Sequence, residues 1–534
     1  MKTIIRILFI TSFVAIVGCT DLDVAPESSA TADLVFTEPA AYKQFLAKIY
    51  AGLAISGQQG PAGDPDITGI DEGFSTYLRQ YWKAQELTTD EAVIAWNDGT
   101  LPTYHLHTWT AQNEFVNAMF NRIYFQISMA NEFLRQTTDD KLTARGNTDE
   151  TKAEVKQFRA EVRFLRALSY WHGLDMFGNI PIVPESNPVG TSSPNQPENG
   201  KLDVFALIES ELKDVEADMG DPGTVEYGRA DKAALWMLLA KLYQNAKVYT
   251  GTAKDTESLT YLNKIIQSGI YSLATDYQDN FLADNNKSPE IIFAVNFDGT
   301  HTQTYGGMTF LCHASVGGSM VAANYGLDGG WAGLRATKNL VNLFPDETGA
   351  TDSRAIFYTA GQSKEIPSTP ITSFNEGYAV PKFVNLTSDG ESGSNSTFVD
   401  NDYPMFRLAD VYLMYAEAVV RGGSGGDQST AVGYINQLRQ RAYGDATGNI
   451  SAANLTLDFL IDERGRELYW EGHRRTDLVR FGLFTTSDSG NPRAIWPWKG
   501  NVPEGKETEA FRDVFPIPAS AKIANPSLEQ NSGY

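Results

Sequence analysis

Cysteine is scarce in this 534-residue sequence, and positive charge is in deficit. The only two cysteines are Cys19 and Cys312, and Cys19 ends an apolar N-terminal segment. Cys312 is therefore left without an intramolecular partner, and a cysteine-based metal cluster is excluded. Lysine and arginine total 43 against 66 acidic residues, which gives a formal net charge of −23. Such a field repels polyphosphates, so we expect no nucleic-acid partner, whereas neutral ligands are not penalised.

Histidine is also rare, with six in the whole chain. The pair His105 and His107 matches no zinc-ligand spacing, so we expect ordinary polar or packed histidines there. No glycine loop ends in the Lys-Ser/Thr pair that a phosphate site requires. We therefore expect no cofactor and no metal. Three aspartates in a loop rich in glycine and proline miss the EF-hand calcium pattern: Asp64, Asp66 and Asp71.

The N-terminus carries the pattern of an export signal. Lys2 and Arg6 supply positive charge, residues 4–17 are mostly apolar, and the segment ends Ile-Val-Gly-Cys at Cys19. This ending resembles the bacterial lipobox, in which the cysteine is acylated and the chain is cut before it. The sequence predicts a signal peptide at 1–18, lipidation of Cys19 and a tether at 19–35. An ordinary signal peptide with a chance cysteine is the alternative.

Apolar periodicity predicts a mainly α-helical protein. An apolar content of 42% is ample for a packed interior. The predicted helices come in pairs with short connections, like degenerate tetratricopeptide repeats, although the strict repeat signature is absent. They span residues 40–53, 113–134, 152–177, 202–219, 232–248, 258–268, 405–420, 428–441 and 456–481.

Two regions break the helical pattern, namely residues 57–73 and 275–401. Both are rich in glycine and polar residues, and the second contains strand-like runs such as 290–296. Long segments of this kind commonly carry function. We therefore expect one domain at 36–534, with binding on the lobe. Its helical scaffold covers about 36–56, 110–270 and 402–485, and its loop-rich lobe covers about 57–109 and 271–401.

Seven stretches follow one another along the chain in a recognisable order. They are AEVRFLRA (160–167), MFGNIPIV (176–183), RLADVYLMYAEA (407–418), IDERGREL (461–468), EGHRRTDLVR (471–480), VFPIP (514–518) and NPSLEQNSGY (525–534). In this order they resemble the SusD/RagB family of outer-membrane nutrient-binding lipoproteins. The resemblance implies a SusD-like helical fold and a non-catalytic protein that is lipid-anchored on the outer membrane and faces the exterior. It further implies binding of neutral oligosaccharides and their delivery to a SusC-like TonB-dependent transporter.

One segment, residues 71–98, is similar to the starch-binding members of this family. An aromatic ring covers the apolar face of a pyranose, while carboxylate, amide and guanidinium groups bond its hydroxyls. Aromatic residues flanked by glycines in the loop-rich lobe would supply the opposite wall. The candidate ligand-binding residues are Asp71, Arg79, Trp96 and Asn97 from this segment, and Tyr305 and Trp331 from the lobe.

Other functions remain as alternatives. Binding of a different glycan, or peptide binding by a helical-repeat scaffold, fits the same framework. A glycosidase would need two carboxylates across a cleft, and Glu463, Glu467 and Glu471 are the acidic group considered for that role. Their spacing along one helix favours a structural ion-pair network instead. Its expected cationic partners are Arg464, Arg474, Arg475 and Arg480.

Overall fold

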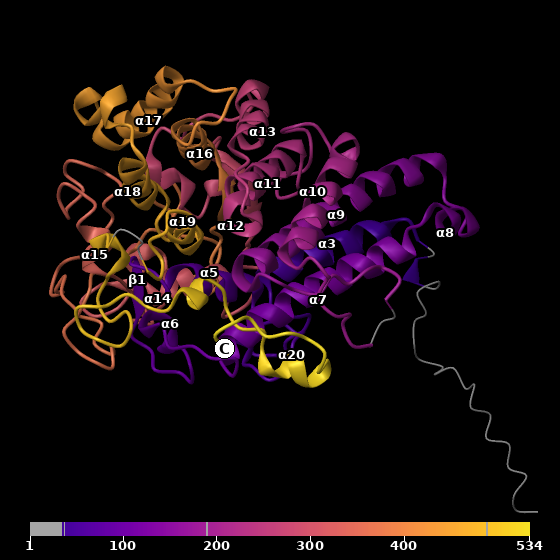
Figure 1. Cartoon of the computed structure of the whole chain (residues 1–534), viewed down its shortest axis with the longest axis horizontal. Helices are drawn as coiled ribbons and strands as arrows, with labels where there is room; N and C mark the ends of the chain where they lie inside the picture. Colours follow the sequence, from indigo (N-terminus) through magenta and orange to yellow (C-terminus); the bar gives the residue numbers. More distant parts are fainter. Residues whose placement is uncertain (1–34, 37, 188–190, 487–489) are drawn as a thin grey trace, which may run out of the picture.

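The computed structural model describes residues 35–534 except for 37, 188–190 and 487–489 (Figure 1). The predicted signal peptide, almost all of the predicted tether and the lipidation site at Cys19 lie outside these residues. Within the described part of the chain, no helix has both the length and the apolar content needed to span a bilayer.

A helical scaffold makes up most of the described chain, as the periodicity predicts. Most predicted helices are present with ends shifted by a few residues. The scaffold helices are α3 (Ala40–Ala54), α7 (Glu114–Gln136), α8 (Asp139–Ala144), α9 (Asp149–Phe177), α10 (Lys201–Val215), α11 (Lys232–Gln244), α12 (Ala246–Thr250), α13 (Asp255–Ser268), α16 (Leu408–Val420), α17 (Gln428–Tyr443), α18 (Leu457–Leu468), α19 (Arg474–Arg480) and α20 (Ala519–Ala524).

Local chemistry sets the limits of the longest helix, α9. The Thr148 hydroxyl accepts a hydrogen bond from the Thr151 backbone N–H and caps the N-terminus. At the other end Gly178 adopts a φ of 72°, a conformation that glycine reaches without strain, and Pro181 follows. The buried side chains of α9 pack against α7 on one side and α10 on another.

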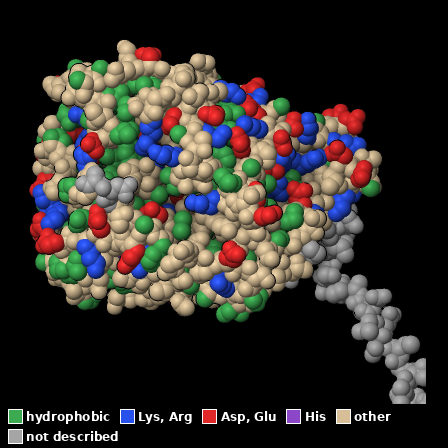
Figure 2. All heavy atoms as spheres, viewed as in Figure 1, with side chains coloured by type: hydrophobic (Ala, Val, Ile, Leu, Met, Phe, Trp, Pro, Cys, Tyr) green, Lys and Arg blue, Asp and Glu red, His purple; other side chains and the backbone are tan. Residues whose placement is uncertain are grey.

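Neighbouring helices stack in succession through the scaffold. Helix α11 packs against α13, α13 against α16, and α16 against both α17 and α18. Figure 1 shows this stack at the top of the molecule, with α3, α7 and α9 at one end and the loop-rich lobe at the other. Over the α8–α10 region of the surface, charges of both signs intermix (Figure 2), and Arg159 pairs with Asp139 there at 2.6 Å.

The loop-rich lobe contains short helices and two small antiparallel sheets. In the first sheet β1 (Ala92–Ile94) pairs with β3 (Leu334–Ala336), and in the second β2 (Ile291–Val295) pairs with β4 (Tyr403–Arg407). The predicted strand-like run at 290–296 is thus a strand. The helices of the lobe are α4 (Glu72–Ser75), α5 (Tyr77–Glu86), α6 (Thr103–Leu106), α14 (Gly307–Ala314) and α15 (Lys338–Val341).

The predicted boundaries need three corrections. Helix α5 lies inside the range 57–109 that we expected to be loop-rich, and every one of its side chains is buried. The predicted helix at 405–420 begins with the last residues of strand β4 and becomes helical only at Leu408. The predicted helix at 456–481 is broken between α18 and α19, because Trp470 adopts a φ of 67° and Gly472 a φ of 74°.

A buried ion-pair cluster joins the lobe to the scaffold. Arg407 bonds Glu290, Glu467 and Glu471 at 2.6–2.7 Å, and Arg354 bonds Glu463 and Glu467 at 2.9–3.0 Å. The predicted network around the three glutamates is therefore confirmed, but apart from Arg466, which pairs with Glu463, its cations come from more distant segments. Three of the four expected arginines pair with other carboxylates and the fourth, Arg475, approaches one at 3.8 Å: Arg464 with Asp410, Arg474 with Asp90, Arg480 with Glu417, and Arg475 with Asp175.

Candidate glycan-binding site

The pairing of β1 with β3 brings two candidate tryptophans together from distant parts of the sequence. Trp96 follows β1, Trp331 precedes β3, and the Ala95 N–H donates to the Gly333 carbonyl at 2.8 Å. The Trp96 indole N–H donates to the Trp331 carbonyl at 3.1 Å, and the ring centroids lie 6.4 Å apart. A side chain at position 333 would meet the Trp96 ring at 2.8 Å, so glycine is needed for this contact.

Tyr305 extends this pair to a row of three rings, which we call the aromatic arc (Trp96, Trp331 and Tyr305). Its ring centroid lies 6.5 Å from that of Trp331 and 5.4 Å from that of Phe398. Tyr305 is 39% exposed and both tryptophans are half-buried, so part of each ring is accessible to solvent. Three of the six candidate residues therefore form one continuous aromatic surface.

A buried carboxylate that the sequence did not point to holds Tyr305 in place. Glu72 accepts hydrogen bonds from the Thr304 hydroxyl at 2.6 Å and from the Tyr305 backbone N–H at 3.3 Å. The Ser56 hydroxyl also donates to Glu72, which ties the arc to the end of α3. Only its position beside Asp71 could have drawn attention to Glu72, because its partners come from distant segments.

Arg79 lies behind the arc rather than on its surface. The side chain is 4% exposed, and Nη1 donates to the carbonyls of Gly73 at 2.6 Å and Tyr305 at 3.3 Å. Its guanidinium carbon is 4.1 Å from the ring centroids of Phe74 and Phe310 and 5.6 Å from that of Trp96. Burial lowers the pKa of Arg79 to about 9, against the opposing effect of Asp71 and its neighbours.

The other two polar candidates lie at the edges of the arc. The Asp71 carboxylate accepts from the Gly73 N–H at 3.0 Å and caps α4, so part of its hydrogen-bonding capacity is used within the loop. Asn97 is exposed directly after Trp96. Among the described residues the Asn97 amide has no hydrogen-bond partner, and the negative charge of Asp71 raises the pKa of Arg79.

A second residue that the sequence did not single out, His313, supports the arc from below. Its ring is stacked on Trp331 with centroids 4.7 Å apart and an angle of 22° between the planes. The two ring nitrogens lie 2.6 Å from the Gly329 carbonyl and 2.9 Å from the Thr397 carbonyl. His313 thus links the segments on either side of the arc to the Trp331 ring.

The two histidines noted in the sequence are packed in the interior, and one of the loop aspartates forms an ion pair. His107 bonds the Thr88 carbonyl at 2.7 Å and the Thr508 hydroxyl at 3.0 Å, and His105 is buried, so both are packed as expected. Asp66 pairs with Lys48 at 3.1 Å. Within the described chain, no group of three or more histidine, cysteine or acidic residues is arranged to hold a metal ion.

Two family models match the chain. Residues 358–534 match the model described as the SusD family, and residues 22–244 match one described as "Starch-binding associating with outer membrane". The starch-binding protein SusD of Bacteroides thetaiotaomicron is 36% identical over the full length of both proteins. A SusD-like protein of Bacteroides ovatus is 23% identical and covers 97% of this chain and 96% of its own.

Solved structures share the fold. A SusD homologue from B. thetaiotaomicron superposes with a TM-score of 0.73 at 18% identity, covering 94% of this chain and 98% of its own. Surface glycan-binding protein A from the same species, in complex with laminarihexaose, gives a TM-score of 0.66 at 20% identity and covers 92% and 99%. Given the full-length identity to SusD and the two family matches, the chain belongs to the SusD/RagB family.

Proposed function

We propose that this protein captures a neutral oligo- or polysaccharide at the cell surface through the aromatic arc, with a starch-like α-glucan as the best candidate. The observation that carries the proposal is the row of three partly exposed rings, Trp96, Trp331 and Tyr305. Successive rings are tilted by 43° and 51°, so the row is not flat. Such a row fits a helical α-glucan better than a straight, flat β-1,4-linked chain.

The polar candidates take different roles in this proposal. Asn97 and the free lone pairs of Asp71 bond sugar hydroxyls at the rim of the arc. Arg79 acts as a positioning residue, because its Nη1 is already bound to the carbonyls of Gly73 and Tyr305 and the side chain is buried. Its positive charge still attracts ligand hydroxyl oxygens that approach the loops at Gly73 and Tyr305.

Among the relatives, one supports an α-glucan as the ligand and another supports a β-glucan as the alternative. The full-length relative at 36% identity is a starch-binding protein, whereas the fold neighbour at 20% identity is in complex with laminarihexaose. We infer binding without catalysis, since the candidate catalytic glutamates are fully buried in the ion-pair cluster. Peptide binding by the helical scaffold is the competing function.

Capture would serve uptake at the outer membrane. In this proposal acylation of Cys19 anchors the chain on the exterior of that membrane, and a SusC-like TonB-dependent transporter receives the glycan. Replacing Cys19 with alanine should release the protein from the membrane fraction. Affinity purification from membranes should recover a TonB-dependent transporter with the wild-type chain.

Affinity electrophoresis tests the glycan proposal. A chain that starts at Thr20 should be retarded in gels that contain soluble starch, and Trp331→Ala should be retarded far less. The matched control is Trp236→Ala, which removes a half-buried tryptophan from α11. Retardation by laminarin alone would replace the α-glucan by a β-glucan. A glycan array without hits, together with retention on a peptide library, would overturn glycan capture, and released reducing sugar would overturn the non-catalytic assignment.

A further inference from the structure

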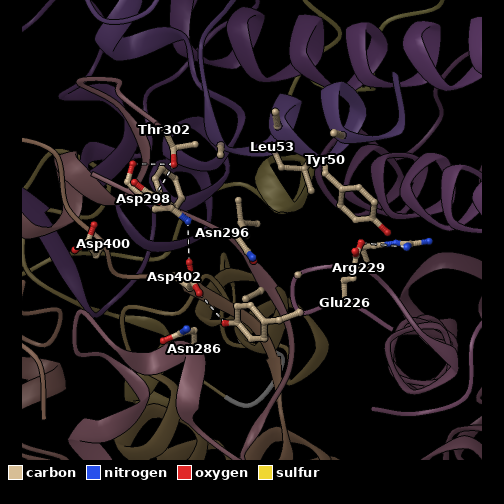
Figure 3. Close-up of a pocket in the computed structure, with 18 of the residues that line it drawn as sticks. Tyr50, Leu53, Glu226, Arg229, Asn286, Asn296, Asp298, Thr302, Asp400 and Asp402 are labelled. Atoms are coloured by element: carbon tan, nitrogen blue, oxygen red, sulfur yellow. Dashed lines mark hydrogen bonds and ion pairs between the residues drawn. The ribbon is translucent and has the colours of Figure 1, made fainter. Parts of the chain in front are cut away.

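A second pocket, which neither the sequence nor the relatives point to, lies between helix α3 and the lobe. It has a volume of about 770 Å³, within the range of about 300–1,000 Å³ that is typical of small-molecule sites. Figure 3 shows Tyr50 and Arg229 on one side of it and Asp298, Asp400 and Asp402 on the other. Buried apolar side chains form its floor: Leu46, Leu53, Ala54, Val295 and Phe297.

The most distinctive group in this pocket is the Tyr227 ring. It is 47% exposed although its hydroxyl donates to Asp402 at 2.7 Å, so the ring is fixed in place while much of its surface stays open. Burial raises the pKa of Asp402 to about 6, against the effect of the Tyr227 hydroxyl bond. A fixed, open aromatic ring over an apolar floor is a stacking surface for a flat apolar face.

Two amides supply hydrogen-bonding capacity that the protein itself does not use. The side chains of Asn286 and Asn296 line the pocket, are exposed and have no hydrogen-bond partner among the described residues. The backbone makes room for one of them, since a side chain at Gly228 would meet the Asn296 amide nitrogen at 2.1 Å. Each amide offers two donors and one acceptor oxygen, which suits ligands that carry several hydroxyl groups.

The charged groups of the pocket are engaged with one another or with the backbone. Arg229 pairs with Glu161, which also accepts from the Tyr50 hydroxyl at 2.8 Å. Lys43 pairs with Glu226 at 2.9 Å. The aspartates accept hydrogen bonds that shape the surrounding loops: Asp298 from Thr300 and His301, Asp400 from Gly299 and Ser394, and Asp402 from Phe297 and Tyr227.

The side chains with unused hydrogen-bonding capacity are therefore the two neutral amides, and they suit a neutral ligand. We infer that this tyrosine pocket (Tyr227, Asn286, Asn296 and the apolar floor) is a second glycan site that takes one or two neutral pyranose units. The apolar face of a sugar ring stacks on Tyr227, and its hydroxyls bond the two amides. An amine ligand would instead have to share the carboxylates, each of which already accepts two or more hydrogen bonds from the loops.

The tyrosine pocket and the aromatic arc share their supporting loops. Thr302 lines the pocket three residues before Tyr305, and Asp400 lines it two residues after Phe398, which contacts the Tyr305 ring. One polysaccharide held at the arc could thus have another segment or end near the pocket. The inference takes its ligand class from the proposed function, but the two sites use different side chains and can be tested separately.

Saturation-transfer NMR on a variant without the arc separates the two sites. The background is Trp96→Ala with Trp331→Ala in the chain from Thr20, and the probes are maltotriose, cellotriose and laminaritriose. We expect transfer to at least one of these sugars to persist in this background. Adding Tyr227→Ala should weaken that residual binding about tenfold, the loss of one aromatic platform. Adding Asn296→Ala should weaken it about fivefold, the loss of its hydrogen bonds to the sugar.

Tyr227→Phe is the matched control, because it keeps the ring and removes only the hydroxyl bond to Asp402. Its residual binding should stay within about threefold of the background value. If the wild type binds these sugars but the arc-deficient variant shows no transfer, the second site is overturned and the proposed function stays intact. Residual transfer that neither Tyr227→Ala nor Asn296→Ala reduces would also overturn it. If transfer persists through the pocket while starch retardation is absent in the wild type, the arc proposal fails instead.

Discussion

Buried arginines have different partners in two regions of the molecule, namely carboxylates in the ion-pair cluster and backbone carbonyls behind the aromatic arc. In the cluster, Arg407 bonds three carboxylates and is 1% exposed. Behind the arc, Arg79 is equally hidden, yet it bonds only backbone carbonyls, and its Nε has no partner in the described chain. The cluster holds the fold together by pairing its cations with carboxylates, whereas behind the arc the buried positive charge bonds backbone carbonyls next to the proposed binding surface.

Lys83 sharpens this contrast. Its Nζ is fully buried without a hydrogen-bond partner among the described residues and lies 3.6 Å from the centroid of the Phe115 ring. Burial lowers the pKa of Lys83, and the nearby charge of Arg79 lowers it further. Incomplete pairing of this kind costs stability, and such costs are characteristic of functional regions.

Acidification should produce the largest effect, because it acts on all carboxylates of the cluster together. Burial alone would raise the pKa of Glu463, but Arg354, Arg466 and Arg439 outweigh it and hold the value at about 2, below the ordinary 4.5. A folded-state pKa below the unfolded value stabilises the fold above pH 4.5, and this stabilisation is lost as the pH falls towards 2. Urea midpoints measured from pH 7 to pH 3 should fall steadily below pH 4.5, and a constant midpoint would contradict the prediction.

Arg407→Met should come next in size. Removal of this guanidinium leaves Glu290, Glu467 and Glu471 buried with fewer cations, which costs about 3–5 kcal/mol of unfolding free energy. Urea denaturation at pH 7 measures the loss. Arg159→Met is the control, because the exposed Arg159–Asp139 pair contributes about 0–1 kcal/mol. Similar losses in the two variants would remove the distinction between the cluster and the surface pairs.

Trp331→Ala should affect binding more than stability. The ring is half-buried, spans the arc between Trp96 and Tyr305, and stacks on His313. We expect a binding loss of about 2 kcal/mol or more, roughly 30-fold, with a smaller change in unfolding free energy. Titration calorimetry with a maltooligosaccharide measures the first and thermal melting the second. Wild-type affinity in Trp331→Ala would exclude the arc as the binding surface.

Much of the fold could be predicted from local patterns, because helix periodicity and capping depend on neighbouring residues. The break after α18 could not, since Trp470 is a non-glycine residue at a φ of 67° that only tertiary packing accommodates. Its indole is fully buried, and its carbonyl accepts from the Trp82 indole at 2.9 Å. The ion-pair cluster could be predicted only in part for the same reason. The spacing of its glutamates was visible in the sequence, but their pairing with Arg354 and Arg407 depends on tertiary contacts.

For the proposed site, the sequence predicted candidate rings but not the residues that support them. Glycine next to Trp331 and Tyr305 was a local signal of exposed aromatics. The pairing of β1 with β3, which joins Trp96 to Trp331, depends on segments far apart in the chain and leaves no local pattern. The burial of Arg79 has the same origin, because the rings of Phe74 and Phe310 that enclose it come from separate helices.

Lys83→Met should give the smallest effect, and its sign tests the comparison. Methionine fills a similar volume without a charge, so it removes the cost of an ammonium group that has no acceptor. The cation–π contact with Phe115 that is lost, about 0.5–2 kcal/mol, offsets only part of this gain. We expect the unfolding free energy to rise by about 1 kcal/mol at pH 6.

The pH dependence gives a second test of Lys83→Met. Because the folded-state pKa of Lys83 is lowered, the wild type regains stability as the pH rises towards 10.5, and the advantage of methionine should shrink at pH 9. A lower urea midpoint in Lys83→Met at both pH values would mean that the buried ammonium stabilises the fold, so that the region behind the arc resembles the ion-pair cluster after all.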